Sequence, residues 1–117
     1  MSNKRTGRMP PDHPDLVRDR SGGMCEGCLV RPAADIHHRR FLSRDGKHNL
    51  ANLAHLCGNG NAAGCHGDAH SGACPDGWSI SAWERRSEDS VPFIDLLGQA
   101  WMFDDHGGKH HAGNPDT

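Results

Sequence analysis

Four of the five cysteines fall into two pairs, and this feature limits most strongly what the chain can fold into. Cys25 and Cys28 form a Cys-x-x-Cys turn, on which two thiolates can reach one ion. Cys57 and Cys65 follow, separated by a glycine-rich loop that is longer than the usual spacing. Four thiolates in a tetrahedral array form a closed site for structural Zn²⁺, and we expect one here. Independent buried or redox-active thiols are the alternative, and Cys74 is either a replacement fourth ligand or a spare thiol.

The small apolar content explains why such a metal site would matter. Leu, Ile, Val and Phe together supply only 17 of the 117 residues. A fraction below roughly 20% is a warning of disorder. Structural zinc contributes roughly 10–16 kcal/mol in small zinc peptides, comparable to the whole stability of a typical domain, about 5–15 kcal/mol. We therefore expect a single small domain that depends on its zinc.

The sequence also argues against several classes of protein. There is no run of about 20 apolar residues, so no membrane span is expected. The basic segment Met1 to Arg8 lacks the apolar stretch of a secretory signal. An odd number of cysteines argues against a closed set of disulfides. A reducing, cytoplasmic location is the expectation that follows.

Charge is distributed unevenly along the chain. Residues 1–47 carry 10 lysines and arginines against 6 acidic residues, whereas residues 48–117 carry 3 against 9. A basic half of this kind favours a nucleic-acid partner. A solvated surface without a partner is the alternative interpretation.

Local patterns predict short elements of both kinds, and hence an α+β fold. Helices are predicted over residues 14–20 and 65–71, the first ended by Gly22-Gly23 and the second by Gly72. Leu50, Leu53 and Leu56 recur every three residues, which fits a helical turn leading into a short strand. The remaining predicted strands cover residues 35–42, 78–82, 91–94 and 101–103.

Histidines cluster directly after both cysteine pairs. His37 and His38 are adjacent on a predicted strand, so they point to opposite faces unless the strand twists or bulges. His66 and His70 are four residues apart and lie on one face of a helix, a spacing that suits a single metal ion. For any one of these residues alone, an ordinary surface or core histidine is the alternative.

Taken in order, these motifs resemble the HNH endonuclease family, of the ββα-metal type, and most closely its short phage-encoded members. The matching motifs are Cys25-x-x-Cys28, His37-His38, Asn52-Leu53 with Leu56-Cys57, and Cys65-His66 with His70. Gly77-Trp78 and the stretch Trp101 to Asp105 match more loosely. The resemblance implies a small ββα-metal motif with a structural four-cysteine zinc site and a short C-terminal β extension.

Local composition predicts a flexible basic arm over residues 1–14 and a disordered tail over 106–117. Between them the resemblance implies a nuclease core over 15–74 and a β extension over 75–105, and it assigns roles within the core. His38 matches the general base, a role that suits a neutral imidazole. Asn52 either orients the base or helps to hold the metal. The implied ligands of the catalytic ion are His37, His66 and His70.

Mg²⁺ or Mn²⁺ is the expected catalytic ion by availability, whereas an all-histidine ligand set also suits Zn²⁺ or Ni²⁺. Arg39 is included in the expected catalytic set because it directly follows the base, and it or Arg40 could bridge the scissile phosphate. The expected DNA contacts are Arg39, Arg40, Arg44 and Lys47.

The implied function is metal-dependent hydrolysis of DNA phosphodiester bonds, by nicking or double-strand cleavage, with DNA and phage terminase as partners in genome packaging. A non-catalytic, zinc-dependent nucleic-acid-binding module is the alternative. His48 and His55 match no family position and are predicted to be loop and surface residues. The three tryptophans are predicted to belong to the core: Trp78, Trp83 and Trp101.

Overall fold

The amino-terminal helix of the chain follows the predicted capping pattern. In the computed structural model, which describes residues 7–59 and 63–112, helix α2 spans His13–Ser21. Pro14 lies in its first turn, where a missing backbone N–H costs nothing, and Gly22 ends it with a left-handed φ of 66°. No helix in the described part of the chain is long and apolar enough to span a membrane.

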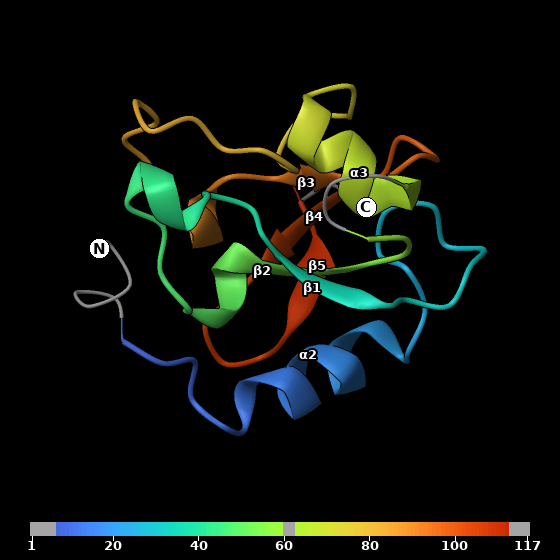
Figure 1. The fold of residues 1–117 in the computed structure, drawn as a ribbon, viewed down its shortest axis with the longest axis horizontal. Helices are drawn as coiled ribbons and strands as arrows, with labels where there is room; N and C mark the ends of the chain where they lie inside the picture. The colour runs from blue at the N-terminus through green and yellow to red at the C-terminus, as the bar shows by residue number, and fades with distance from the viewer. Residues whose placement is uncertain (1–6, 60–62, 113–117) are drawn as a thin grey trace.

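The centre of the fold is an antiparallel hairpin between two helices. Strand β1 (Asp35–His38) pairs with β2 (Leu53–Leu56), so that His37 faces Ala54 and His38 faces Leu53. Figure 1 shows α2 on one side of this hairpin and α3 (Gly64–Ser71) on the other. A 3-10 turn, η2 (Leu50–Asn52), leads directly into β2, as the leucine spacing predicts.

A buried ion pair ties α2 to the Cys-x-x-Cys turn. Arg20 donates to both carboxylate oxygens of Glu26, at 2.9 and 2.7 Å, and also to the carbonyl oxygen of Leu53 at 2.6 Å. The same carboxylate accepts a hydrogen bond from the backbone amide of His55 at 2.8 Å. Because both charges are almost fully buried and paired, loss of one partner would leave an uncompensated charge.

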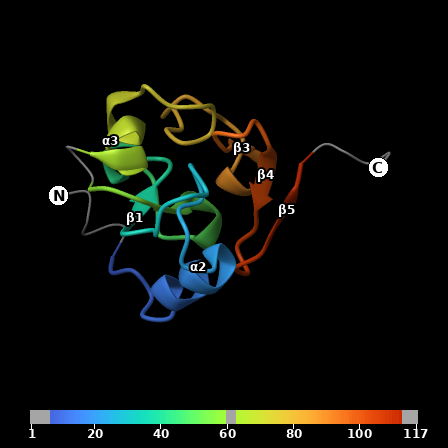
Figure 2. The same cartoon turned by 90° about the vertical axis from the view of Figure 1, so that its right-hand side faces the viewer.

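A second, three-stranded sheet lies beside the hairpin (Figure 2). Strands β3 (Phe93–Ile94), β4 (Ala100–Phe103) and β5 (Lys109–His111) form an antiparallel sheet in that order. Figure 2 shows this sheet beside the hairpin and its two helices. The ring of Phe93 stacks between Trp78 and Phe103, with centroid distances of 5.4 and 5.1 Å. These three rings form the main apolar centre that the sparse composition allows.

Two predicted strands differ from the structure. The strand predicted over residues 35–42 ends at His38, and the chain turns into the 3-10 helix η1 (Leu42–Arg44). The strand predicted over 78–82 is wrong: Trp78 and Ile80 are buried, but no partner strand within the described ranges runs beside them. Burial on alternate residues therefore reflects packing rather than a β ladder at this point.

Parts of both chain ends are built into the fold. Residues 109–111 of the predicted disordered tail form β5, whereas residues 113–117 lie outside the described part. Within the predicted flexible arm, Met9 packs against the cluster of Val17 and Leu50, and residues 1–6 lie outside the described part. A small 3-10 turn, η3 (Glu88–Ser90), completes the described elements.

Candidate metal centres and active site

Four cysteine side chains converge at one end of the hairpin. The Sγ atoms of Cys25, Cys28, Cys57 and Cys65 all lie within 4.8 Å of one another, and those of Cys28 and Cys57 are 4.0 Å apart. Tetrahedral zinc with bonds near 2.3 Å places its sulfur ligands roughly 3.8 Å apart. The four thiols are therefore positioned to hold a metal ion. Cys74 lies outside this group, half-buried against the core.

The long spacing between the second pair of cysteines is closed by backbone geometry. Gly58 and Gly64 adopt φ values of 85° and 68°, and a Cβ on Gly64 would lie 2.7 Å from the Cα of Gly58. The amide of Cys65 then reaches the Sγ of Cys57 at 3.4 Å. Two glycines at positive φ in close contact let the loop return, which larger residues would prevent.

The electrostatics of the thiols favour a bound cation. Burial raises the pKa of Cys65, and the negative charge of Cys25 raises it further. Burial also acts to raise the pKa of Cys28, but backbone N–H groups of Val30 and Arg31 outweigh it and lower the value to about 7. Four neighbouring thiolates repel one another unless a positive ion lies between them, so the donor set fits a metal that binds deprotonated cysteine.

A second group of potential ligands lies where β1 meets α3. One ring nitrogen from each of His37, His66 and His70 lies within 4.8 Å of the others. Nε2 of His37 is 2.6 Å from the carbonyl oxygen of Trp78. A carbonyl can only accept, so Nε2 carries the proton and Nδ1 carries the free lone pair. That Nδ1 is buried and has no hydrogen-bond partner among the described residues.

Two of these histidines, His37 and His70, have lowered pKa values, which favour the neutral form that metal binding requires. Burial lowers the pKa of His37 to about 3, and the neighbouring His66 and His70 lower it further. Burial also lowers the pKa of His70. An unpartnered nitrogen beside two other imidazoles is costly in the interior unless an ion occupies the site, so the residues fit a metal.

Two supporting residues of this cluster were not predicted from the sequence. Asp35 lies 3.1 Å from Nδ1 of His66, which leaves Nε2 as the free ligand atom of that ring. Phe41 stacks on His70 with a centroid distance of 4.9 Å. The signal for Asp35 was available, because Asp35 and His37 are two residues apart on one strand and so share a face.

His38 and the histidine cluster face one pocket. A pocket of about 510 Å³ is lined by Ile36, His38, Phe41, Leu42, Ser43, His66 and His70. Burial lowers the pKa of His38 to about 4, helped by the nearby imidazoles of His48 and His66. His38 is therefore a neutral base at physiological pH, on the wall of the pocket that two of the three potential ligands also line.

Asn52 holds the loop that follows His38. Its Oδ1 accepts from the amide of Arg40 at 2.7 Å, and its Nδ2 donates to the carbonyl oxygens of Arg40 and Lys47 at 3.0 and 2.8 Å. The side chain is fully buried. The sequence left two roles open for Asn52, orienting the base or helping to hold the metal. Its Oδ1 and Nδ2 are already engaged with backbone groups, which favours a role in orienting the loop next to His38 over a role as metal ligand.

Two of the four basic residues expected to contact DNA lie inside the protein. Arg39 is fully buried and donates to carbonyl oxygens in three separate segments, those of Gly77, Ala51 and Val91. Arg40 is 8% exposed and pairs with Glu88 at 2.6 Å. Both arginines link the hairpin to the segment of residues 77–91. Because neither guanidinium faces solvent, neither is placed to make the expected phosphate contact.

The other two basic residues lie at the surface. The guanidinium of Arg44 packs over the ring of Phe41 at 4.3 Å, at the edge of the pocket that holds His38. Lys47 is exposed. Nη1 of Arg44 also donates to the hydroxyl of Ser79 at 3.1 Å and to the carbonyl oxygen of Ile80 at 3.3 Å, so Lys47 is the one of these four basic residues whose side chain is exposed.

The structure corrects part of two predictions: that all three tryptophans are core residues, and that His48 and His55 are loop and surface residues. Trp78 is buried, as expected, but Trp83 is 90% exposed and is not a core residue. His55 is 8% exposed and its Nδ1 lies 2.7 Å from the hydroxyl of Ser21, so it is not a surface residue. His48 lies in a loop as predicted, yet its ring contacts His38.

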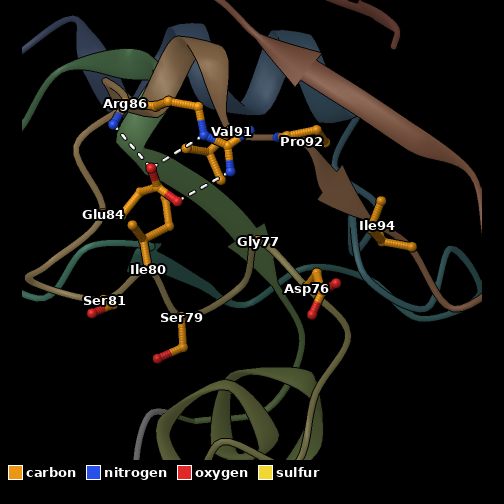
Figure 3. A pocket seen from close by; sticks show the side chains of 10 residues that line it. All are labelled: Asp76, Gly77, Ser79, Ile80, Ser81, Glu84, Arg86, Val91, Pro92 and Ile94. Atoms are coloured by element: carbon orange, nitrogen blue, oxygen red, sulfur yellow. Dashed lines mark hydrogen bonds and ion pairs between the residues drawn. The ribbon is translucent and has the colours of Figure 1, made fainter. Parts of the chain in front are cut away.

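A second pocket, of about 400 Å³, is lined by residues between Asp76 and Ile94. Figure 3 shows Glu84 and Arg86 joined across its rim, with Asp76 and Ile94 at the far end. No histidine or cysteine of the described residues lines it. The clustered histidines His38, His66 and His70 line the first pocket instead.

Comparison with protein-family models finds no match, and comparisons with curated proteins and with solved structures also find none.

Proposed function

We propose that the chain is a metal-dependent endonuclease that hydrolyses DNA phosphodiester bonds. The observation that carries this proposal is the shared pocket: neutral His38 lines the same 510 Å³ pocket as two members of the three-histidine cluster. Hydrolysis of a phosphodiester needs a base for water and a positive charge at the phosphate, and this pocket offers groups for both.

The two ligand groups differ in the way that structural and catalytic sites differ. Four cysteines fill a tetrahedral shell, which leaves no position for water, and we assign Zn²⁺ to this group as a structural ion. Three histidines leave at least one position open. Mg²⁺ or Mn²⁺ would serve there by availability, and Zn²⁺ or Ni²⁺ by ligand preference.

An ion held by His37, His66 and His70 would neutralise phosphate charge and stabilise the departing oxygen. His38 accepts one proton from water as the new oxygen–phosphorus bond forms. The bond to the leaving oxygen breaks in the same step, and that oxygen takes a proton from solvent. Asn52 keeps the loop after His38 in place. The exposed Lys47 and the half-buried Arg44 are the nearby cations that suit the flanking phosphates.

Conversion of supercoiled plasmid to nicked or linear DNA tests the proposal. Cleavage is expected with Mg²⁺ or Mn²⁺, or with Zn²⁺ or Ni²⁺, and EDTA should stop it. The matched control is His66→Ala, which removes a catalytic ligand and leaves the four thiols intact. If DNA and RNA stay intact with every metal while nucleic acid still binds, the protein is the non-catalytic zinc-dependent module instead.

A further inference from the structure

We infer that His48 is a positioning residue for His38, and that it leaves Nδ1 of His38 as the atom that accepts the proton. The inference rests on the proposed nuclease function. His48 belongs to none of the motifs in the cysteine and histidine pattern, and it lies ten residues beyond His38 on the far side of a loop. Its role follows from the direction of two successive hydrogen bonds.

The first bond fixes the proton on His48. Nε2 of His48 lies 3.0 Å from the carbonyl oxygen of Gly7. Because a carbonyl oxygen has no proton to give, Nε2 of His48 must be the donor. A neutral imidazole carries one N–H, so Nδ1 of His48 is then an acceptor.

The second bond passes this assignment to His38. Nε2 of His38 lies 3.0 Å from Nδ1 of His48, and an acceptor on His48 requires a donor on His38. Nε2 of His38 therefore carries the proton, and its Nδ1 carries the lone pair. No hydrogen bond to that Nδ1 is made by any residue in the described ranges 7–59 and 63–112, and the His38 side chain lines the candidate active-site pocket.

The backbone that carries His48 is also held by side chains from other segments. His13, at the start of α2, contacts the carbonyl oxygen of His48 at 2.8 Å through its Nδ1. Asn52 donates to the preceding carbonyl, that of Lys47, at 2.8 Å. These two hydrogen bonds to the carbonyl oxygens of Lys47 and His48 limit movement of the backbone at His48. The His48 ring therefore starts from a fixed position, from which it can orient the ring of His38.

The tautomer of His38 can be measured without any cleavage assay. Nitrogen-15 NMR of the zinc-loaded full chain should show His38 protonated at Nε2 and bare at Nδ1. His48→Asn keeps an acceptor near the position of Nδ1 and should preserve that state. His48→Leu removes the acceptor and should give a mixture of both tautomers. An unchanged spectrum in His48→Leu would overturn the inference.

Kinetics supply the second readout. General bases contribute typically 10²–10⁴-fold to rate, and a partly wrong tautomer should lose about 10–100-fold of kcat in His48→Leu. KM and affinity for the catalytic metal should stay unchanged, and His48→Asn should recover most of the loss. His106→Leu, an exposed histidine outside the pocket, is the matched control and should retain full activity.

Failure of this inference is separable from failure of the proposed function. If the wild-type chain cleaves DNA and His48→Leu matches it in kcat, the positioning role is wrong and the nuclease proposal stands. If the wild-type chain cleaves nothing, the nuclease proposal fails, and the catalytic role of His48 fails with it, whatever the tautomer spectra show. Thermal unfolding of each variant identifies any loss caused by unfolding.

Discussion

The carboxylate of Asp35 lies 3.1 Å from Nδ1 of His66, joining the start of β1 to helix α3. An acid on the outer nitrogen of a histidine fixes the ring orientation and makes the inner nitrogen a better ligand. The His66 side chain is 10% exposed, whereas that of Asp35 is 40% exposed. The carboxylate can therefore be removed with little disturbance of the core.

We predict that Asp35→Ala weakens binding of the catalytic metal by about 10–100-fold, the usual effect of losing such a supporting partner. Titration calorimetry with Mn²⁺ measures the change. Asp68→Asn, an exposed carboxylate on the same helix as His66, is the control and should leave the affinity unaltered. If Asp35→Ala and wild type bind Mn²⁺ with equal affinity, Asp35 does not support His66 as a metal ligand.

His38→Ala and His66→Ala should fail in different ways. His38→Ala should lose most cleavage, about 10²–10⁴-fold, while metal and DNA affinity stay nearly intact. His66→Ala should lose metal affinity, and high metal concentration should restore part of its activity by mass action. Cleavage rate against metal concentration separates the two. If His38→Ala loses the metal and His66→Ala keeps it, the two roles are reversed.

Each chain should retain about one zinc ion after dialysis, as elemental analysis would show. Cys25→Ser or Cys57→Ser should unfold the chain, because the metal contributes folding free energy directly. Cys74→Ser is the control, since this thiol lies outside the four-cysteine group. A zinc-free chain with native circular dichroism would contradict this expectation.

Glu88→Gln should destabilise the fold at neutral pH, and the effect should shrink as the pH falls. Burial acts to raise the pKa of Glu88, but hydrogen bonds from Arg40 and Asn49 outweigh it and leave the pKa below its ordinary value. A carboxyl with a lowered pKa stabilises the folded state above its unfolded value, about 4.3. This stabilisation is lost as pH falls through the folded pKa.

Urea unfolding with excess zinc, from pH 7 to well below the unfolded pKa of about 4.3, measures the difference between wild type and Glu88→Gln. The control is Glu84→Gln. Its partner Arg86 lowers the pKa of Glu84 to about 2, but this pair lies at the surface, where solvent screens it. If the difference in unfolding free energy between wild type and Glu88→Gln is constant with pH, the carboxylate charge of Glu88 does not stabilise the fold.

The four-cysteine group and the pairing of His66 with His70 could be predicted from residue type and spacing, because metal chemistry demands particular ligands. The addition of His37 to that pair was implied by the family resemblance, and the three side chains do lie together. Helices α2 and α3 were predictable from their proline and glycine signals. Helix ends depend on residues that are close in sequence. Metal-ligand sets are limited by the few residue types that can bind an ion.

Other features depended on contacts that no local pattern encodes. Arg39 looks like a surface cation in the sequence, but its buried guanidinium donates to four carbonyl groups from distant segments. The pairing of His38 with His48 depends on loop closure by Asn52. The alternation at Trp78 and Ile80 indicated burial correctly and strand pairing wrongly.

Trp78 joins the two ligand groups physically. Its carbonyl oxygen contacts His37, while a Cβ on Gly27, inside the Cys-x-x-Cys turn, would lie 2.5 Å from its ring. An ion that rigidifies the turn therefore also fixes the carbonyl that orients His37. By thermodynamic reciprocity, each ion should then bind more tightly when the other is present. Under the proposed nuclease function, zinc supply would in this way set the fraction of molecules that can hold the second ion, before any DNA is bound.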